Sequence, residues 1–164
     1  MRDITETVKQ LIIINIIFFI GTQVVGDVAY KFLSLYYPEN PDFKFWQPIS
    51  HMFMHGNFMH IFFNMFALFS FGTALEQIWG TKKFLFFYIS CGLGAALIHI
   101  ASNYYFFHDG LDTLIANGMS KVEIMQVLSE GKFDSRWQEI LSQEGFTSFI
   151  SAYMTPAVGA SGAI

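Results

Sequence analysis

Three long apolar runs constrain this chain more than any other feature of its sequence. They occupy residues 11–29, 58–78 and 84–107. Each has about the twenty residues that an α-helix needs to cross the hydrocarbon core of a bilayer. Charged residues make up only 13% of the chain, whereas a soluble domain carries roughly a quarter. The sequence therefore predicts an all-α, polytopic membrane protein with three full transmembrane helices.

Small and polar residues predict how these helices begin, end and pack. Asn57 is a good N-cap for the second helix, and Gly80 is a good C-cap for it. Small residues allow helices to approach closely in a membrane. Gly21 and Gly26 therefore predict close helix contact in the first run, and the small residues at 91–96 predict it in the third.

The third run also carries two polar side chains, His99 and Asn103. Polar side chains within transmembrane helices commonly form hydrogen bonds to a neighbouring helix, so we expect interhelical hydrogen bonds from both. Cys91, in the same run, is the single cysteine of the chain and forms no internal disulfide.

After the third run the composition becomes polar and charged, with moderate apolar periodicity. This part, residues 108–155, predicts an external amphipathic helical insertion within a single membrane domain of residues 1–164. From residue 156 onward the chain is expected to begin a fourth transmembrane helix. The insertion is expected to hold helices near 121–129 and 136–143, after capping-box patterns at Ser120–Glu123 and Ser135–Gln138.

The placement of basic residues predicts the topology. Arg2, Lys9, Lys82 and Lys83 lie on one side of the membrane if the first two spans cross it. The positive-inside rule places that side in the cytoplasm, and Lys31 and Lys44 on the other side weaken the asymmetry without reversing it. We expect an integral protein of a bacterial cytoplasmic membrane, with its N-terminus in the cytoplasm and its insertion outside. The lipid bilayer is its expected partner, and the absence of a basic run argues against nucleic acid.

Two polar residues in the second run, His60 and Asn64, are four positions apart and share a helical face. Because both are costly in hydrocarbon, they are expected to face the protein interior or a water-filled cavity. Ser161 enters from the same external side, in the sequence Gly-Ala-Ser-Gly at 159–162. Ser161 is either a nucleophile or part of a close-packed helix start. Histidine and asparagine donors near a serine hydroxyl suit oxyanion stabilisation, and this convergence favours the functional interpretation.

His51 and His55 raise a second interpretation, in which they bind a metal ion together with His60. The His-x3-His spacing suits helical chelation, but no His-Glu-x-x-His sequence or nearby pair of acids accompanies it. Hydrogen bonds that anchor the loop are the favoured role for His51 and His55. The sequence predicts no metal and no cofactor, and a metal-binding or transport protein stays as a rival.

The pattern His-x3-His-x4-His-x3-Asn at 51–64, with Glu76-x3-Gly80 and the later Gly-Ala-Ser-Gly, resembles the rhomboid family of intramembrane serine proteases. The resemblance covers residues 11–107 and 153–164. It implies a six-helix membrane core in which a serine on the fourth helix attacks a substrate peptide bond. A histidine on the sixth helix is the implied general base.

The resemblance implies a role for individual residues of this chain. Ser161 matches the nucleophile, and His60 and Asn64 match the side chains that stabilise the oxyanion together with the backbone N–H of Ser161. Backbone support for the oxyanion and the substrate falls to Gly159, Ala160 and Gly162.

The chain also departs from the family pattern. Trp46 matches the first residue of the family's Trp-Arg loop motif, but Gln47 stands where many members have arginine. The 108–155 segment is longer than the corresponding loop of the smallest members. The chain stops three residues after Ser161, so the helix that carries the base is missing.

The predicted function is that of an intramembrane serine endopeptidase, which hydrolyses peptide bonds in or near transmembrane segments of membrane-protein substrates. The chain is expected to be the N-terminal portion of a longer product and to be inactive alone, because a serine without a base is a poor nucleophile. The alternative is a catalytically inactive relative that binds transmembrane helices for trafficking or degradation.

Overall fold

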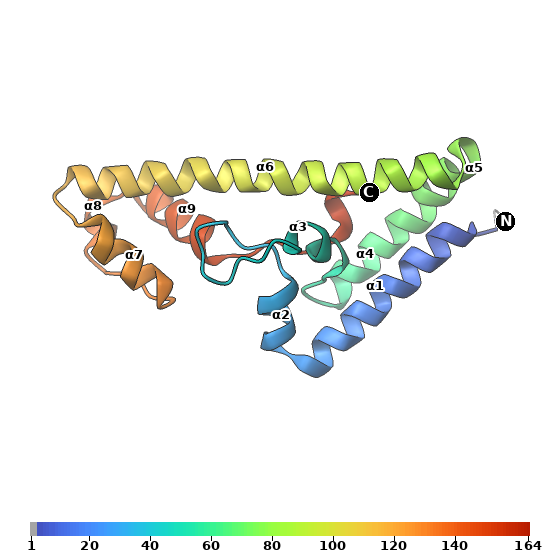
Figure 1. The fold of residues 1–164 in the computed structure, drawn as a ribbon, viewed down its shortest axis with the longest axis horizontal. Helices are drawn as coiled ribbons and strands as arrows, with labels where there is room; N and C mark the ends of the chain where they lie inside the picture. Colours follow the sequence, from blue (N-terminus) through green and yellow to red (C-terminus); the bar gives the residue numbers. More distant parts are fainter. Residues whose placement is uncertain (1–2) are drawn as a thin grey trace. The chain divides into compact units, whose positions relative to one another are not determined.

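The protein is described here by a computed structural model of residues 3–164 (Figure 1). These residues form α-helices with short 3-10 and π-helical segments, and among them there is no β-strand, as predicted. They divide into two compact units. The first unit holds the described residues up to Leu35, with Phe45–Leu97 and Ala157–Ile164, and the second holds Tyr36–Lys44 and Ile98–Pro156.

The first predicted span is two helices rather than one. Helix α1, Glu6–Val25, starts earlier than expected, and α2, Asp27–Leu33, follows it. Gly26 separates them with a φ of 71°, a left-handed backbone that L side chains rarely adopt. The prediction of close helix contact at Gly21 and Gly26 is wrong for the described residues, because no atom of another helix among them lies within 4 Å of a Cβ placed on either glycine. Gly26 is used for its backbone and not for packing.

The second span begins and ends where the sequence predicts. The Asn57 side chain accepts a hydrogen bond from the His60 amide, and Gly80 ends the span with a φ of 77°. Between these caps the helix is not uniform, because a π-helical segment interrupts it. The span consists of α4 (Phe58–Ala67), the π segment η2 (Leu68–Gly72) and α5 (Thr73–Trp79).

The third span lies within one helix, α6, which runs over Thr81–Ala116 and is 36 residues long. It passes the composition change at residue 108 because Leu111 and Leu114 are buried in the core of the second unit. The run of small residues at 91–96 packs closely against other parts of the chain at some positions only. A Cβ on Gly92 would lie 2.2 Å from the end of the Met52 side chain, whereas one on Gly94 would meet nothing within 4 Å.

The expected interhelical hydrogen bonds of His99 and Asn103 take a different form. The Asn103 Nδ2 atom lies 3.1 Å from the His99 Nε2 atom, and both residues belong to α6. Because residues four apart are neighbours on a helix surface, the two polar groups satisfy each other within one helix. The structure therefore shows an intrahelical pair.

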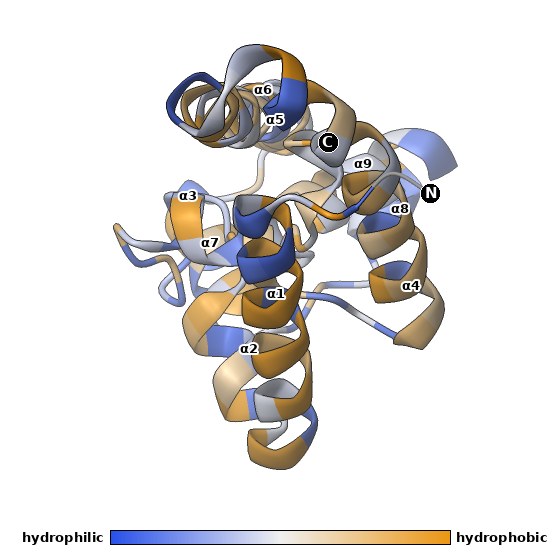
Figure 2. Cartoon of the chain, turned by 90° about the vertical axis from the view of Figure 1, so that its right-hand side faces the viewer, coloured by the Kyte–Doolittle hydropathy of each residue, from blue (hydrophilic) through white to orange (hydrophobic). Residues whose placement is uncertain are grey.

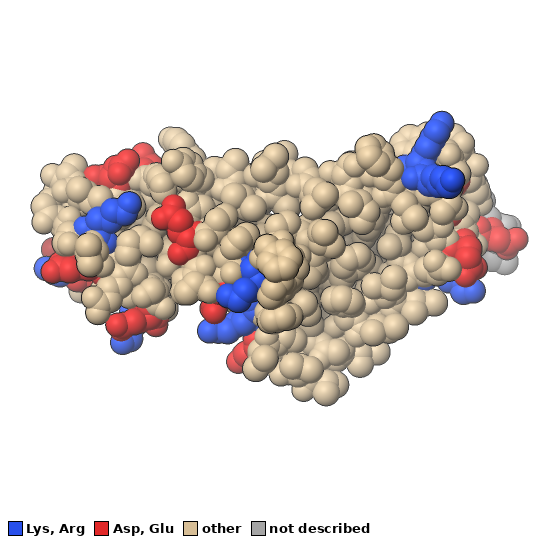
Figure 3. Space-filling view, viewed as in Figure 1, with Lys and Arg blue, Asp and Glu red and all other residues tan. Residues whose placement is uncertain are grey.

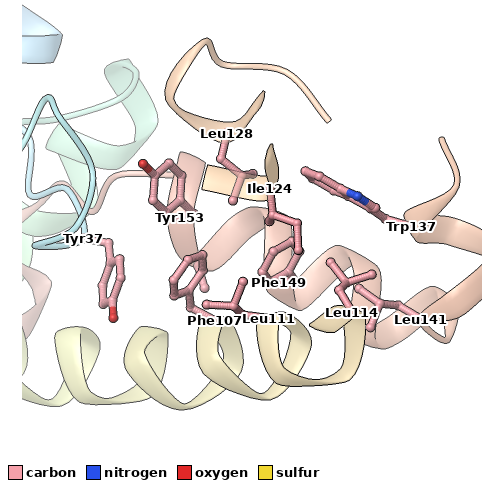
Figure 4. Packing of buried hydrophobic residues seen from close by; sticks show 11 residues of the cluster. Tyr37, Phe107, Leu111, Leu114, Ile124, Leu128, Trp137, Leu141, Phe149 and Tyr153 are labelled. Carbon is pink, nitrogen blue, oxygen red and sulfur yellow. The ribbon is translucent and has the colours of Figure 1, made fainter. Parts of the chain in front are cut away.

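The second unit has its own hydrophobic core, which Figure 4 shows at close range. Phe107 of α6 stacks on Phe149, with ring centroids 5.4 Å apart, and the Trp137 ring meets Phe149 edge-on at 5.8 Å. Aromatic rings of this size supply much of the buried apolar area of a small core. The helices that contribute are α7 (Lys121–Ser129), α8 (Trp137–Ile140) and α9 (Gln143–Met154), together with part of α6.

Only one of the two predicted helices of the insertion keeps its predicted bounds. Helix α7 matches 121–129, but the Ser120 side chain makes no cap hydrogen bond. Helix α8 is shorter than the predicted 136–143, and α9 was not predicted. The Ser142 side chain caps α9 by accepting a hydrogen bond from the Gly145 amide at 3.0 Å. That residues 1–164 form one membrane domain with an insertion stays a prediction.

Three helical stretches are long and apolar enough to cross a membrane, as the sequence predicts: Glu6–Val25, Phe58–Trp79 and Thr81–Ala116. Large apolar side chains on them are exposed, including Phe86 at 76% and Ile78 at 75%. Figure 2 shows that much of the ribbon of α1 and α4 has the colour of hydrophobic residues, and Figure 3 shows how few charged atoms lie over much of the face in view. Exposed apolar side chains on a spanning helix suit contact with lipid.

Candidate active site

The candidate site lies within the first unit and begins at the start of α4. The Asn57 Oδ1 atom accepts a hydrogen bond from the His60 amide at 2.9 Å, which fixes the first turn of the helix. One turn later comes Asn64, which is only 7% exposed, while His60 is half-buried. The spacing of four residues places both side chains on one face. Helix α4 therefore presents an imidazole and an amide together.

The second part of the site is the serine turn, residues 159–162. An antiparallel bridge between Leu35 and Ala157, with both hydrogen bonds at 2.9 Å, holds the chain just before it. The Gly159 amide then donates to the His51 carbonyl at 2.9 Å. Ala160–Gly162 form the 3-10 helix η3, in which Ser161 is exposed. Backbone hydrogen bonds thus fix the entry to the turn.

Gly159 brings these two parts into contact. Its φ is 119° and its ψ 153°, a combination that glycine adopts without strain. A Cβ placed on Gly159 would lie 2.7 Å from the His60 Nε2 atom and 3.6 Å from the Asn64 Nδ2 atom. The backbone of the turn is therefore seated directly against the two polar side chains of α4. Only a glycine leaves room for that approach.

The far end of the turn packs just as closely. A Cβ on Gly162 would stand 2.4 Å from the Cβ of Ala95 on α6. Ala160 has no exposed surface, and Ala163 is 4% exposed in the core of the first unit. Ser161 and Gly162 are thus the exposed residues of the turn, between the buried Ala160 and Ala163.

The hydrogen bonds of His60 and Asn64 leave donors available near the turn. The Gly56 amide donates to the His60 Nδ1 atom at 3.4 Å, so the neutral ring carries its proton on Nε2, the nitrogen next to Gly159. The Asn64 Nδ2 atom is buried and has no hydrogen-bond partner among the described residues. Two N–H donors, at His60 Nε2 and Asn64 Nδ2, thus lie against the turn that carries Ser161.

The other two histidines of the pattern support the site. The His51 Nδ1 atom lies 2.9 Å from the Gln47 carbonyl, and the His51 carbonyl holds Gly159. His55 is fully buried, and its ring meets the His60 ring edge-on with centroids 5.1 Å apart. Burial, and to a lesser extent the neighbouring His60, lower the pKa of His55 to about 4, so His55 is neutral near pH 7.

Side-chain hydrogen bonds of Trp46 and Gln47 anchor the loop before α4. Gln47 has no exposed surface, and its Nε2 atom donates to the Lys31 carbonyl at 3.2 Å. The Trp46 indole donates to the Phe32 carbonyl at 2.9 Å. Glutamine at position 47 therefore ties the loop to α2.

The sequence did not predict two features of the site. The first is that the His51 carbonyl positions Gly159, because a backbone acceptor leaves no trace in the sequence. The second is the approach of Tyr30 on α2, whose hydroxyl would lie 3.2 Å from a Cβ on Gly56. Among the described residues no group of three or more His, Cys, Asp or Glu side chains is arranged to hold a metal ion.

The chain is similar to a known domain family and to proteins of that family. The family model of the Rhomboid domain matches residues 42–135. "Rhomboid protease AarA" of Providencia stuartii is 45% identical over 58 residues, which are 35% of this chain and 20% of that protein. "RHOMBOID-like protein 5" of Arabidopsis thaliana is 38% identical over 53 residues, or 32% of this chain and 17% of that protein.

"Rhomboid protease GluP" of Bacillus subtilis (strain 168) is 32% identical over 54 residues, or 33% of this chain and 11% of that protein. The matched part thus covers a fifth or less of each of these relatives. The family model, by contrast, covers more than half of the 164 residues. With its three helices able to span a membrane, the chain is an integral membrane protein that belongs to the rhomboid family, the family of the rhomboid-type intramembrane proteases.

Proposed function

We propose that this chain supplies the nucleophile and the oxyanion-binding groups of a serine-type intramembrane endopeptidase. The observation that carries the proposal is the seating of Gly159 against the His60 Nε2 and Asn64 Nδ2 atoms, two residues before Ser161. The substrates would be membrane proteins, cleaved in or near their transmembrane segments. The activity, substrates and partners proposed here refer to the whole protein and not to residues 1–164 alone.

In the proposed reaction the Ser161 hydroxyl attacks the scissile carbonyl, and negative charge develops on the carbonyl oxygen. The His60 Nε2–H and the free N–H of the Asn64 amide would donate to that oxygen, together with the Ser161 backbone N–H. Donors held in place before the reaction stabilise such charge strongly, and the loss of one typically lowers kcat about 10²- to 10³-fold. Gly159 leaves the space, and the buried Ala160 and the packed Gly162 hold the turn.

The proposal assigns the general base to none of the described residues. The resemblance implies a histidine on a later helix, which would take the proton of the Ser161 hydroxyl. His60 serves instead as a donor, because its Nδ1 atom accepts from Gly56 and its Nε2 atom carries the proton. Residues 1–164 alone are therefore expected to show no turnover, since a serine without a base is a poor nucleophile.

The proposed orientation places the N-terminus in the cytoplasm of a bacterium and the insertion, residues 108–155, outside. Of the basic residues that support this, Lys82 and Lys83 lie at the start of α6, and Arg2 lies outside the described residues. A variant with Cys91→Ser and Ser129→Cys tests it, because Ser129 is exposed on α7. A membrane-impermeant maleimide should label the cysteine at position 129 in intact cells. Labelling only after permeabilisation would show the opposite orientation.

A serine-directed fluorophosphonate tests the nucleophile in a protein that carries this chain together with the later helices of the family. Labelling should disappear in Ser161→Ala and persist in Ser129→Ala, a matched change at an exposed serine outside the site. Equal labelling of the wild type and Ser161→Ala would contradict the assignment.

Turnover of a transmembrane substrate tests the oxyanion groups. His60→Ala and Asn64→Ala should each lower it by about 10²-fold or more. Unchanged turnover in folded variants would contradict their role. Capture of transmembrane helices without labelling or cleavage would favour the alternative, an inactive relative that binds such helices.

A further inference from the structure

An apolar groove lies between α1 and α4, within the first unit. Its volume is about 480 Å³, and each of the nine residues that line it is Ile, Phe or Met. Ligand pockets of ~300–1,000 Å³ usually add a few polar groups that orient the ligand. The side chains of this groove supply none, so it suits a ligand that is apolar along its whole length. The lining includes Ile12, Ile16 and Phe19 of α1, Phe58 and Phe62 of α4, and Phe69 of η2.

The groove follows one half of the second span. Phe58 is the first residue of that span, and Phe69, eleven residues further along, lies near its middle. At 1.5 Å per residue, this part of the helix is about 16 Å long. The hydrocarbon core of a bilayer is about 30 Å thick, so one leaflet contributes about 15 Å. The groove thus extends from the end of the span to the middle of the bilayer.

The groove is continuous with the surface of the spans that faces lipid. Phe62, inside the groove, is 51% exposed. Ile17 and Phe63 follow two of the lining residues in the sequence, and each is 60% exposed without lining the groove. Because the chain is an integral membrane protein, the medium at this depth consists of acyl chains and not of water. The groove therefore opens to acyl chains.

The dimensions of the groove favour one acyl chain over a whole helix. A helix with its side chains is about 10–12 Å across, so a length of about 16 Å fills on the order of 1,250–1,800 Å³. Carbon atoms in contact are about 4 Å apart, so a hydrocarbon chain of the same length fills only ~200–300 Å³. With its volume of about 480 Å³, the groove holds the chain and not the helix.

We infer that this groove binds one acyl chain of a bilayer lipid, from the leaflet in which α4 begins. The chain would lie along the two helices, between the isoleucines of α1 and the phenylalanines of α4. At 3.6 residues per turn, Phe58 and Phe62 lie on the opposite face of α4 from His60. This binding site therefore goes beyond the proposed function and does not depend on it.

The test uses the full-length protein in vesicles of phosphatidylcholine, a small fraction of which carries a photoreactive diazirine halfway along one acyl chain. After illumination and digestion, mass spectrometry measures the modification of each residue. Leu97 of α6 is the matched reference, because it lies 17 residues from Gly80 and Phe62 lies 18 residues from it. Leu97 is also the more exposed of the two, at 69%. Contact with bulk lipid alone would therefore favour modification of Leu97.

Phe62 and Met65 should be modified about twofold or more above Leu97, because protein covers about 70–90% of a ligand in a pocket and leaves less lipid to react with the carbene. Ile16→Trp should lower the modification of Phe62 to the level of Leu97, since the larger side chain fills the groove. Ile17→Trp, on the same helix but outside the lining, should leave it unchanged. Circular dichroism and thermal unfolding check that both variants are folded.

Three results would overturn the inference. Modification of Phe62 at or below that of Leu97 would show that the groove is ordinary lipid-facing surface. The absence of any modification in the groove would show that another part of the protein, or a second copy, covers it. Equal modification of Phe62 in the wild type and in folded Ile16→Trp would show that the reacting chain lies outside the groove. The first two results come from the wild type and do not depend on the folding of a variant.

Discussion

Replacing Gly159 with alanine probes the contact on which the candidate site depends. The backbone at this residue has a φ of 119° and a ψ of 153°, a region that residues other than glycine occupy at a cost of about 1–3 kcal/mol. The added Cβ would also stand 2.7 Å from the His60 Nε2 atom and 2.8 Å from its Cε1 atom. Gly159→Ala therefore has two separate costs, one in the backbone and one in packing.

The displacement follows from the distances. Ordinary van der Waals contacts of a Cβ begin at 3.4 Å, whereas the added Cβ would lie 2.7 Å from the His60 Nε2 atom. The imidazole or the turn must therefore move by at least 0.7 Å. Overpacking of this kind costs about 1–3 kcal/mol. Together with the backbone cost of about 1–3 kcal/mol, the expected loss of folding stability is about 2–6 kcal/mol. A misplacement of about 1 Å in a catalytic group lowers rates about 10²-fold. We expect a similar loss of turnover.

The assay pairs cleavage of a transmembrane substrate with thermal unfolding, for the full-length protein in one detergent. Gly21→Ala is the matched control, because a Cβ there meets nothing within 4 Å and the residue lies inside α1. The control should keep full turnover and gain up to about 1 kcal/mol of stability, since alanine is the better helix former.

A double-mutant cycle isolates the contact with His60. In a His60→Ala background the packing cost of Gly159→Ala should disappear, while the backbone cost of about 1–3 kcal/mol stays. Wild-type turnover in Gly159→Ala would refute the proposed geometry. An identical loss of stability in both backgrounds would show that the imidazole is not what the Cβ meets.

Three further predictions concern stability. Glu76→Gln should lower the free energy of unfolding by about 1–3 kcal/mol, because the buried carboxylate accepts from two threonine hydroxyls and a backbone amide; the exposed Glu6→Gln should change it little. Because burial lowers the pKa of His55 from 6.5 to about 4, stability should be full above pH 6.5 and fall by up to ~3 kcal/mol as the pH drops to 4. His55→Phe should remove this pH dependence, and a slope equal to wild type would contradict it. Gly162→Ala, whose Cβ would stand 2.4 Å from that of Ala95, should cost about 1–3 kcal/mol in thermal unfolding, whereas Gly94→Ala, in open space, should be close to neutral.

The sequence predicted the parts of the fold that local chemistry controls. The three spans follow from the length and hydropathy of their runs. The second span begins after Asn57 and ends at Gly80 as expected, because a helix cap depends on one side chain or one backbone angle. Helix α7 also lies where its periodicity placed it.

Other features were mispredicted because distant contacts decide them. Helix α6 passes the composition change near residue 108, since Leu111 and Leu114 reach the core of the second unit. Gly26 breaks the first helical run, although its sequence context suggested close packing. His99 and Asn103 pair within α6 rather than across helices. In each case the residue type was informative, but its partner was not fixed by neighbouring residues.

The candidate site divides in the same way. The sequence by itself placed His60 and Asn64 on one helical face, because a spacing of four residues sets that geometry in any α-helix. Only the tertiary structure brought Gly159 against them, through the bridge at Leu35 and the His51 carbonyl. Those hydrogen bonds join backbone groups that almost every residue carries, so no side chain marks which two segments meet. The helix face is a local property of the sequence, whereas the position of the turn against it depends on the whole folded unit.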